Sequence, residues 1–449
     1  MPRLGSELRK LVTLALPLSL AQLAQSGMSF VDTLFVGRLG PTSLAGLALG
    51  STVFFTVYNV LMAVLLAVAP LVAHATGAGR GREPGLVAGQ ALVLAVLLAV
   101  PGAALFLNAQ PLLLLLGLPL SSVEPAAAYL RALSPGLPFA LGFVALRGLL
   151  EGHGDARPIL FIALAGVGVN VFLNDTLIFG RYGLPAFGIV GAGFTTAAVF
   201  TLMFAAATWL VRTRYRRQAV FANLRRLDPA RMREILRVGW PIAAMLGLEV
   251  SAFSVTTFVL GGFGDAVLAG HQIAMQSASM TFMIPLGIAT ATAVLVGQAA
   301  GRRDPAGVRR AGAMGIGLAT AFMCASALLF WLAPQVVIGL FVDLYAPQNA
   351  ELVAYAATFL GIAAMFQLVD GMQVTAQGAL RGLKDTRVPM LLTLVAYWFV
   401  GIATGLVLTF GLNVGPRGMW FGLVAGLAVA ALLLVLRFSR LSGRSARLT

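Results

Sequence analysis

The sequence predicts an all-α integral membrane protein, with twelve transmembrane helices in two six-helix lobes that are related by a pseudo-two-fold axis along the membrane normal. Three observations predict this fold: 59% of the residues are apolar, only 10% are charged, and the second half of the chain repeats the first. Soluble domains carry about 25% charged residues. A duplicated chain that is almost wholly apolar is typical of a secondary transporter.

The internal repeat covers both halves of the chain. Residues 241–304 align without gaps with residues 17–80, and the Ala-Leu-Arg-Gly segment at 145–148 recurs at 379–382. Similar sequences should fold into similar lobes, so we expect function to depend on the positions at which the two halves differ. Identical pairs in the gapless alignment include Pro17 with Pro241, Gly40 with Gly264, and Gly77 with Gly301.

Six apolar segments in the first half, each bounded by charged residues, proline or glycine, predict six membrane-spanning helices. Each has roughly the 20 residues that are needed to cross about 30 Å of hydrocarbon. The first segment resembles a signal peptide, because Arg9 and Lys10 precede it. Its repeat lies in the middle of the chain, where no signal peptide can be, so we predict a permanent span. The helices are expected near 11–37, 43–75, 86–108, 122–148, 158–181 and 188–211.

The second half contains six further apolar segments, after a connection that is rich in arginine. This composition predicts a solvated loop beside the membrane. We therefore expect an N-terminal lobe at 1–211, a cytoplasmic linker at 212–234, a C-terminal lobe at 235–437 and a cytoplasmic tail at 438–449. The helices of the second lobe are expected near 235–261, 268–299, 310–332, 351–380, 388–411 and 418–437.

The distribution of lysine and arginine predicts the orientation of these helices. All but four of the 31 lysines and arginines fall on the side that holds both predicted termini, and such an excess marks the cytoplasmic side. We therefore expect a multi-pass membrane protein with both termini in the cytoplasm. Both halves start on the same side, which favours an axis along the membrane normal over inversion. The four exceptions are Arg38, Arg131, Arg181 and Arg417.

Three acidic residues lie inside predicted spans: Asp32, Glu249 and Asp370. A charge at the bilayer centre costs about 2.5–3.5 kcal/mol on insertion scales, so these carboxylates should face a polar cavity or bind protons. The repeat does not require them, because Asp32 aligns with Thr256 and Glu249 aligns with Gln25. Each acid therefore belongs to one lobe only, which favours a functional role.

Polar residues accompany the acids. Asn170 and Asn174 are four residues apart in the fifth span, so they share one face of that helix. We predict that Asp32, Asn170 and Asn174 form a cation-coupling and substrate site in the N-terminal lobe, and that Glu249 and Asp370 form one in the C-terminal lobe. Either site is a candidate for Na⁺. The predicted accessory residues are Gln272, Gln276, Gln373, Asp175 and His271. The predicted cavity walls are Phe253, Met275, Met280, Phe282 and Met283.

Other classes of function find no support in the sequence. The net charge of +15 does not indicate a nucleic-acid partner, because the cations gather in loops between apolar segments. The chain has no phosphate-binding P-loop and no metal or nucleophile constellation, so we expect neither an enzyme nor a cofactor.

The principal alternative within the class of transporters is a lipid-linked oligosaccharide flippase. Its anionic pyrophosphate cargo should call for arginine or lysine within the spans, whereas the intramembrane charges here are acidic.

Short motifs recur in a fixed order within the predicted spans. They are Val31-Asp32-Thr33, Leu44-Ala45-Gly46, Ala269-Gly270-His271-Gln272-Ile273-Ala274, Pro285-Leu286-Gly287 and Val296-Gly297-Gln298. Together they resemble the multidrug and toxic compound extrusion (MATE) family over nearly the whole chain. The resemblance is greatest to the NorM-type bacterial branch, because Glu249 in helix seven and Asp370 in helix ten match its acids.

The resemblance implies antiport. Family members export cationic amphipathic compounds in exchange for inward sodium ions or protons, and their lobes alternate between outward-open and inward-open forms. Asp32 matches the family's acid in the first lobe, and Asn170 and Asn174 match its amide positions. We therefore expect cationic drugs or dyes and the lipid bilayer as partners, a monomeric chain, and H⁺ or Na⁺ as the coupling ion.

Two positions depart from related sequences. NorM-type members can have a tyrosine one turn before the helix-ten acid, where this chain has Phe366. The DinF-like branch has an aspartate where this chain has Asn174.

Removal of a carboxylate from water favours its protonated form, which makes proton coupling reasonable. The sequence leaves the choice between H⁺ and Na⁺ open.

Overall fold

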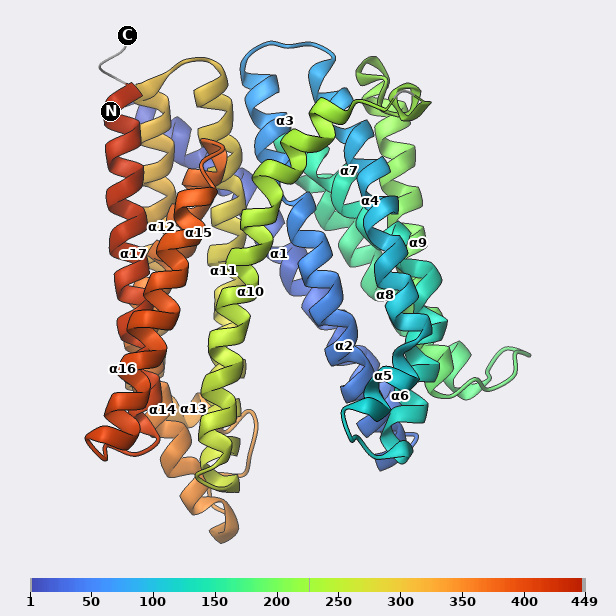
Figure 1. Ribbon diagram of the computed structural model, residues 1–449, viewed down its shortest axis with the longest axis vertical. Coiled ribbons are helices and arrows are strands. Elements are labelled where there is room, and N and C mark those ends of the chain that lie inside the picture. Colours follow the sequence, from blue (N-terminus) through green and yellow to red (C-terminus); the bar gives the residue numbers. More distant parts are fainter. Residues whose placement is uncertain (1, 226, 446–449) are drawn as a thin grey trace. The chain divides into compact units, whose positions relative to one another are not determined.

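The computed structural model describes residues 2–225 and 227–445, and every regular element within these ranges is helical (Figure 1). Twelve of the helical segments are long and apolar enough to cross a membrane, which confirms the predicted number of spans. The chain divides into two compact units. The N-terminal unit is Leu20–Ala243, and the C-terminal unit combines Met1–Ser19 with Ala244–Thr449.

Two of the first six spans consist of more than one helix. The second contains α2 and α3, and the fourth contains α6, a 3-10 turn and α7. Pro135 and Pro138 lie at this turn and remove two backbone N–H donors, so the α-helix is interrupted there. The elements are α1 (Pro2–Gly37), α2 (Pro41–Leu65), α3 (Val68–Gly77), α4 (Glu83–Leu107), α5 (Ala109–Leu115), α6 (Leu120–Leu133), η1 (Ser134–Gly136), α7 (Leu137–Gly152), α8 (Arg157–Phe179) and α9 (Ile189–Arg214).

The remaining spans include long single helices and one span with two π-helical segments. Asp304 caps α12, because its side chain accepts a hydrogen bond of 2.8 Å from the backbone N–H of Gly307. The elements are η2 (Arg216–Gln218), η3 (Val220–Arg225), α10 (Pro229–Gly261), α11 (Asp265–Gly301), α12 (Pro305–Leu332), α13 (Pro334–Ile338), η4 (Pro347–Asn349), α14 (Ala350–Gly382), α15 (Arg387–Leu394), η5 (Val395–Ile402), α16 (Ala403–Leu406), η6 (Val407–Gly411) and α17 (Arg417–Ser445).

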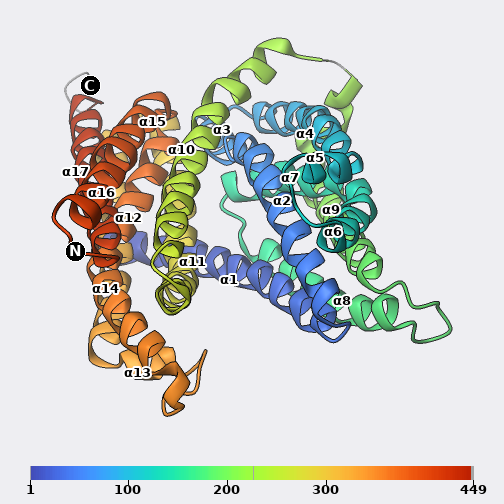
Figure 2. The same cartoon turned by 60° about the horizontal axis from the view of Figure 1, so that its bottom comes forward.

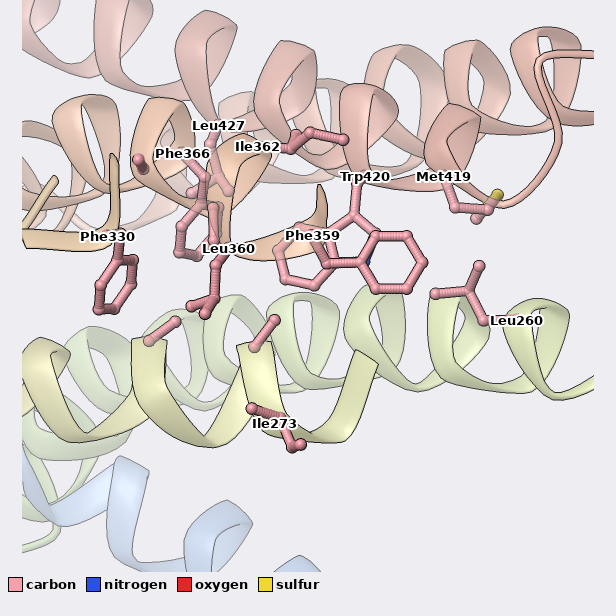
Figure 3. Packing of buried hydrophobic residues seen from close by; sticks show 14 of the residues in the cluster. Leu260, Ile273, Phe330, Phe359, Leu360, Ile362, Phe366, Met419, Trp420 and Leu427 are labelled. Carbon is pink, nitrogen blue, oxygen red and sulfur yellow. The ribbon is translucent and has the colours of Figure 1, made fainter. Parts of the chain in front are cut away.

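One central helix organises each unit. In the N-terminal unit α7 packs against α2, α3, α4 and α9, and it lies within that bundle when the bundle is viewed towards its end (Figure 2). In the C-terminal unit α14 packs against α11, α12 and α17. The core of this second bundle is aromatic, with the fully buried Trp420 stacked on Phe359 at 5.7 Å between ring centroids (Figure 3).

The backbone confirms the gapless part of the repeat. Gly40 precedes α2 with φ 108° and ψ 172°, and Gly264 precedes α11 with φ 110° and ψ 168°. Glycine adopts this region at little cost, whereas L side chains rarely do. The two glycines therefore build the same tight connection between the first and second spans of each half.

The second part of the repeat has a different register from the one that the sequence match indicates. The N–H of Asp155 donates to the carbonyl of Leu150 at 2.9 Å, and that of Asp385 donates to the carbonyl of Leu380 at 3.0 Å. Leu380 is therefore equivalent to Leu150. The Ala-Leu-Arg-Gly match would pair it with Leu146, one helical turn earlier, because a short motif in a helix can be displaced by one turn and still keep its face.

Glycines at the ends of α7 and α14 support the corrected register. A Cβ atom at Gly152 would clash with Val72, and one at Gly382 would lie 3.0 Å from Cβ of Val296. Val72 and Val296 are partners in the gapless alignment. Gly382 is therefore equivalent to Gly152, and both glycines allow a close helix crossing at the same end of their units.

Replacement of Gly382 by alanine is expected to lower the melting temperature of the detergent-solubilised protein. The new Cβ would lie 2.5 Å from the carbonyl oxygen of Ala293, and overpacking of this kind typically costs about 1–3 kcal/mol. Gly361 on the same helix is the control, because nothing lies within 4 Å of a Cβ there. A melting temperature for Gly382→Ala that equals or exceeds that of Gly361→Ala would contradict the close crossing.

The unit boundaries differ from the predicted lobe boundaries of 1–211, 212–234 and 235–437. They fall inside α1 and α10, after Ser19 and Ala243, which are equivalent positions of the repeat. The start of α1 belongs to the C-terminal unit, because the hydroxyl of Ser19 donates to the carbonyl of Ile284 at 3.0 Å. The start of α10 belongs to the N-terminal unit, where Arg231 pairs with Glu83 at 2.8 Å.

The predicted linker and tail also differ in extent. The connection between α9 and α10 packs on the N-terminal unit, because Gln218 accepts a hydrogen bond of 3.3 Å from the backbone N–H of Gly85. The guanidinium of Arg212 also lies 4.8 Å from the ring centroid of Phe221. In the predicted tail, α17 continues to Ser445, and residues 446–449 lie outside the described residues.

Candidate functional site

The N-terminal unit surrounds Asp32 with side chains from two other helices. Asp32 lies on α1 and is 8% exposed. Its Oδ1 accepts hydrogen bonds from the amide of Asn170 at 2.9 Å and from that of Asn174 at 2.6 Å, both on α8. Its Oδ2 faces the hydroxyl of Thr196 on α9 at 3.4 Å. The structure thus brings together all three residues that were predicted for this lobe.

Only neutral groups contact the carboxylate of Asp32. The two amides and one hydroxyl are dipoles, and within the described residues no arginine or lysine forms an ion pair with Asp32. The amide oxygen of Asn174 is buried and has no hydrogen-bond partner in the described part of the chain. An unpaired buried carboxylate is costly, so this arrangement favours occupation by a proton or a small cation.

Asp32 opens onto a cavity that contains about 860 Å³ of space, part of which is open to the outside. Three of its aromatic rings form a cluster, in which Phe200 lies 6.1 Å from Phe54 and 5.9 Å from Tyr58. A cation held beside such rings is attracted to their faces. The cavity therefore combines one carboxylate with a wall suited to apolar cations.

The C-terminal unit places Glu249 of α10 and Asp370 of α14 on a second cavity, of about 1,270 Å³ including open space. Asp370 is 3% exposed. Neither carboxylate has a hydrogen bond or an ion pair to any residue that the structure describes. Arg381 is close enough to Glu249 to act on it electrostatically. Of the predicted wall residues, those that line this cavity are Phe253, Met275 and Phe282.

The two carboxylates of the C-terminal unit act on each other electrostatically. Like charges that share a buried site cannot both remain ionised at low cost. A cation, either a proton on one carboxyl group or a metal ion beside both, removes this repulsion. The site can therefore bind one positive charge, and it would lose that charge when another cation takes its place.

Two predicted accessory residues have partners other than the acids. Asp175 forms an ion pair with Arg181, with 3.0 Å between Oδ2 and Nη1. His271 is fully buried, its Nε2 is hydrogen-bonded to Thr257 at 2.8 Å, and its ring contacts Trp420 edge-on at 5.5 Å. These contacts give both residues a structural explanation.

The predicted accessory glutamines do not line either acid cavity. Gln272 and Gln276 are exposed on α11 of the C-terminal unit. Gln373 is fully buried on α14, one turn beyond Asp370, and its amide has no partner among the described residues. The predicted wall residues Met280 and Met283 also lie outside both cavities.

Sequence reasoning missed two hydroxyl groups near the acids. Thr196 contacts Asp32, and Tyr397 lines a small cavity together with Glu249. Threonine is common in membrane helices, so nothing in the sequence distinguishes Thr196 as a partner of Asp32. Tyr397 is one of only seven tyrosines and lies inside an apolar span, and this combination could have identified it.

Comparison with known proteins identifies the family. A family model described as MatE matches residues 17–176 and 241–407. The "Probable multidrug resistance protein NorM" of Burkholderia mallei is 43% identical over 447 residues, covering 98% of this chain and 94% of the relative. The protein with the same name from Deinococcus radiodurans is 43% identical over 442 residues, covering 96% and 95% of the two chains.

Solved structures agree with this result at the level of the fold. "Crystal structure of MATE in complex with MaD3S" matches with a TM-score of 0.89 at 22% identity, covering 98% of this chain and 97% of the other. "Crystal structure of eukaryotic MATE transporter AtDTX14" matches with a TM-score of 0.85 at 20% identity and covers 98% of both chains. The family model and the relatives together show that this chain belongs to the MATE family of membrane transporters, in its NorM-type branch, and is not an enzyme.

Proposed function

We propose that this protein is a secondary multidrug efflux antiporter of the bacterial cytoplasmic membrane, with both termini in the cytoplasm, and that it exports cationic amphipathic compounds in exchange for H⁺ or Na⁺. The names of the relatives, which are multidrug resistance proteins, support the drug substrates. The excess of arginine and lysine on the side of the termini supports the orientation.

The observation that carries the proposal is the pair of carboxylates in the C-terminal unit, of which Asp370 is buried and Glu249 is partly exposed. Glu249 and Asp370 line one cavity, and no described residue forms a hydrogen bond or ion pair with either of them. Mutual repulsion gives this site an affinity for a small cation. We assign the binding of the coupling ion to this pair.

The N-terminal unit is the proposed binding site for the drug cation, although Asp32 with Asn170 and Asn174 also provides oxygen atoms for a coupling ion. The charge of an amphipathic cation would lie near Asp32, and its apolar rings would pack on Phe54, Tyr58 or Phe200. Cation–π contacts contribute about 2 kcal/mol or more when the partners are desolvated. Affinity for many compounds follows from a wall of aromatic and Met side chains, which can adapt to different shapes.

Exchange requires that the two ligands oppose each other. If the coupling ion and the drug favour different conformations, binding of one lowers the affinity for the other by the same factor in both directions. An inward ion gradient then drives outward drug movement. No ATP is needed.

The flippase alternative is not favoured by the cavities. Neither of the two large cavities has an arginine or a lysine among its lining residues. A pyrophosphate would need such groups to balance its charge. The acidic character of both cavities instead favours a cationic cargo.

Transport by proteoliposomes that are loaded with ethidium tests the proposal. An inward proton gradient and an inward sodium gradient are imposed separately, and ethidium efflux is compared with that from protein-free liposomes. We expect one of the gradients to accelerate efflux, which names the coupling ion. Efflux equal to that of protein-free liposomes under both gradients would refute the antiporter assignment.

A further inference from the structure

Tyr397 in the eleventh span has a buried hydroxyl group without a partner. Its side chain is 5% exposed, and no described residue forms a hydrogen bond with its hydroxyl oxygen. Buried tyrosine hydroxyls usually have a hydrogen-bond partner, because the loss of water is costly otherwise. The hydroxyl is therefore available to a group or ion that enters its surroundings.

These surroundings include the acids of the C-terminal unit. Tyr397 and Glu249 both line a small cavity of about 220 Å³ including open space, and Phe253 lines it as well. Glu249 and Phe253 also line the large cavity that contains Asp370. Both carboxylates lie close enough to Tyr397 to act on it electrostatically. Glu249 thus lines both the cavity of the phenol and the cavity of the second acid.

The local backbone of this span is unusual. Tyr397 lies in η5, a π-helical segment, and π-helical turns occur frequently at functional sites. The same segment packs closely on α17, because a Cβ at Gly401 would lie 3.3 Å from the carbonyl oxygen of Gly422. This close packing fixes the segment that carries Tyr397 against α17.

The repeat shows that the tyrosine belongs to one unit only. Helix α8 begins at Arg157 and α15 begins at the equivalent Arg387, so Tyr397 aligns with Val167. In the N-terminal unit this fifth span provides two amides to Asp32. The corresponding span of the C-terminal unit places a phenol in one cavity with Glu249, and neither acid has a hydrogen-bond partner within the described residues.

We propose that the hydroxyl of Tyr397 is an oxygen ligand of the coupling-cation site that Glu249 and Asp370 form. A phenol can donate a hydrogen bond to an ionised carboxylate, and it can direct its lone pair towards Na⁺ or towards a protonated carboxyl group. Because the loaded site gains a direct contact between this oxygen and the cation, the hydroxyl stabilises the loaded state more than the unloaded one. This inference rests on the assignment of Glu249 and Asp370 to the coupling ion.

Tyr397→Phe tests the inference, because it removes one oxygen atom and keeps the ring. Efflux is measured in proteoliposomes as a function of the concentration of whichever ion drives the unaltered protein. We expect the half-saturating concentration of that ion to change by about tenfold, as the loss of one hydrogen bond to a charged group implies. The maximal rate should remain within about twofold. Tyr355→Phe is the matched control, since Tyr355 lies on α14 about 22 Å along the helix from Asp370.

A second measurement keeps the test independent of transport. The melting temperatures of the purified variants are followed against Na⁺ concentration and against pH, and Tyr397→Phe should need about tenfold more of the stabilising cation than Tyr355→Phe. Equal cation dependence in the two variants would overturn the role of Tyr397. Absence of transport in the unaltered protein would instead refute the proposed function, while this binding measurement still decides the role of Tyr397.

Discussion

Glu249→Gln and Asp370→Asn are each expected to lower gradient-driven efflux by at least about tenfold, which corresponds to about 1.4 kcal/mol, while the protein remains folded and inserted. An amide has nearly the shape of the carboxyl group, but it does not take up a proton in this pH range and carries no negative charge to attract a metal ion. The change also removes a buried charge that has no hydrogen-bond partner in the described structure, so the melting temperature should stay the same or rise.

The measurement is ethidium uptake into everted membrane vesicles, in which an exporter transports its substrate into the lumen, normalised to the amount of protein in the membrane. Glu351→Gln is the control, because Glu351 lies at the exposed first turn of the same helix as Asp370. It should transport like the unaltered protein. Full transport by either cavity variant, or a large fall in its melting temperature, would show that the two acids only support packing.

Asp32→Asn is expected to abolish drug resistance in cells and to leave the N-terminal unit folded. The geometry explains both parts of this result. Both amide donors contact Oδ1 of Asp32, which an asparagine oxygen can replace, whereas Oδ2 faces only the hydroxyl of Thr196 at 3.4 Å. That hydroxyl can accept a hydrogen bond from the new amide. The substitution therefore keeps the hydrogen bonds and removes the charge.

Minimum inhibitory concentrations for ethidium, in cells that express equal amounts of each variant, provide the measurement. Asp175→Asn is the matched control, since its partner Arg181 is largely exposed and such pairs contribute about 0–1 kcal/mol. It should retain resistance. Unchanged resistance in Asp32→Asn would exclude Asp32 from the transport mechanism.

Much of the fold follows from local properties of the sequence. Hydropathy identifies the twelve spans because a segment that crosses lipid must be apolar and must form its backbone hydrogen bonds within its own helix. The repeat identifies the acids that symmetry does not require, and a spacing of four residues places Asn170 and Asn174 on one face. Close contact between Asp32 and both amides could therefore be predicted, although the cavity beside them could not.

The features that could not be predicted depend on packing between distant segments. The unit boundaries divide α1 and α10, and nothing in a continuous apolar helix marks the point at which its neighbours change. The Ala-Leu-Arg-Gly match gave a register that differs by one turn, because its small and apolar residues suit either position. Tyr397 stands out in the sequence as a tyrosine in an apolar span, but its place in one cavity with Glu249 depends on a π-helical segment, for which the sequence has no recognised signal. Gln272 and Gln276 are predicted accessory residues because they are polar within a span, yet they are exposed on α11.

Competition between drug and coupling ion is the central claim, and equilibrium binding tests it most directly. The dissociation constant of ethidium is measured by fluorescence on the purified protein, with increasing Na⁺ at fixed pH and with decreasing pH at fixed Na⁺. Coupled sites typically change each other's affinity by about 5- to 150-fold. We expect the coupling ion to weaken ethidium binding within this range, and we expect the Glu249→Gln/Asp370→Asn double variant to lose the dependence. An ethidium affinity that is independent of both ions in the unaltered protein would contradict the account.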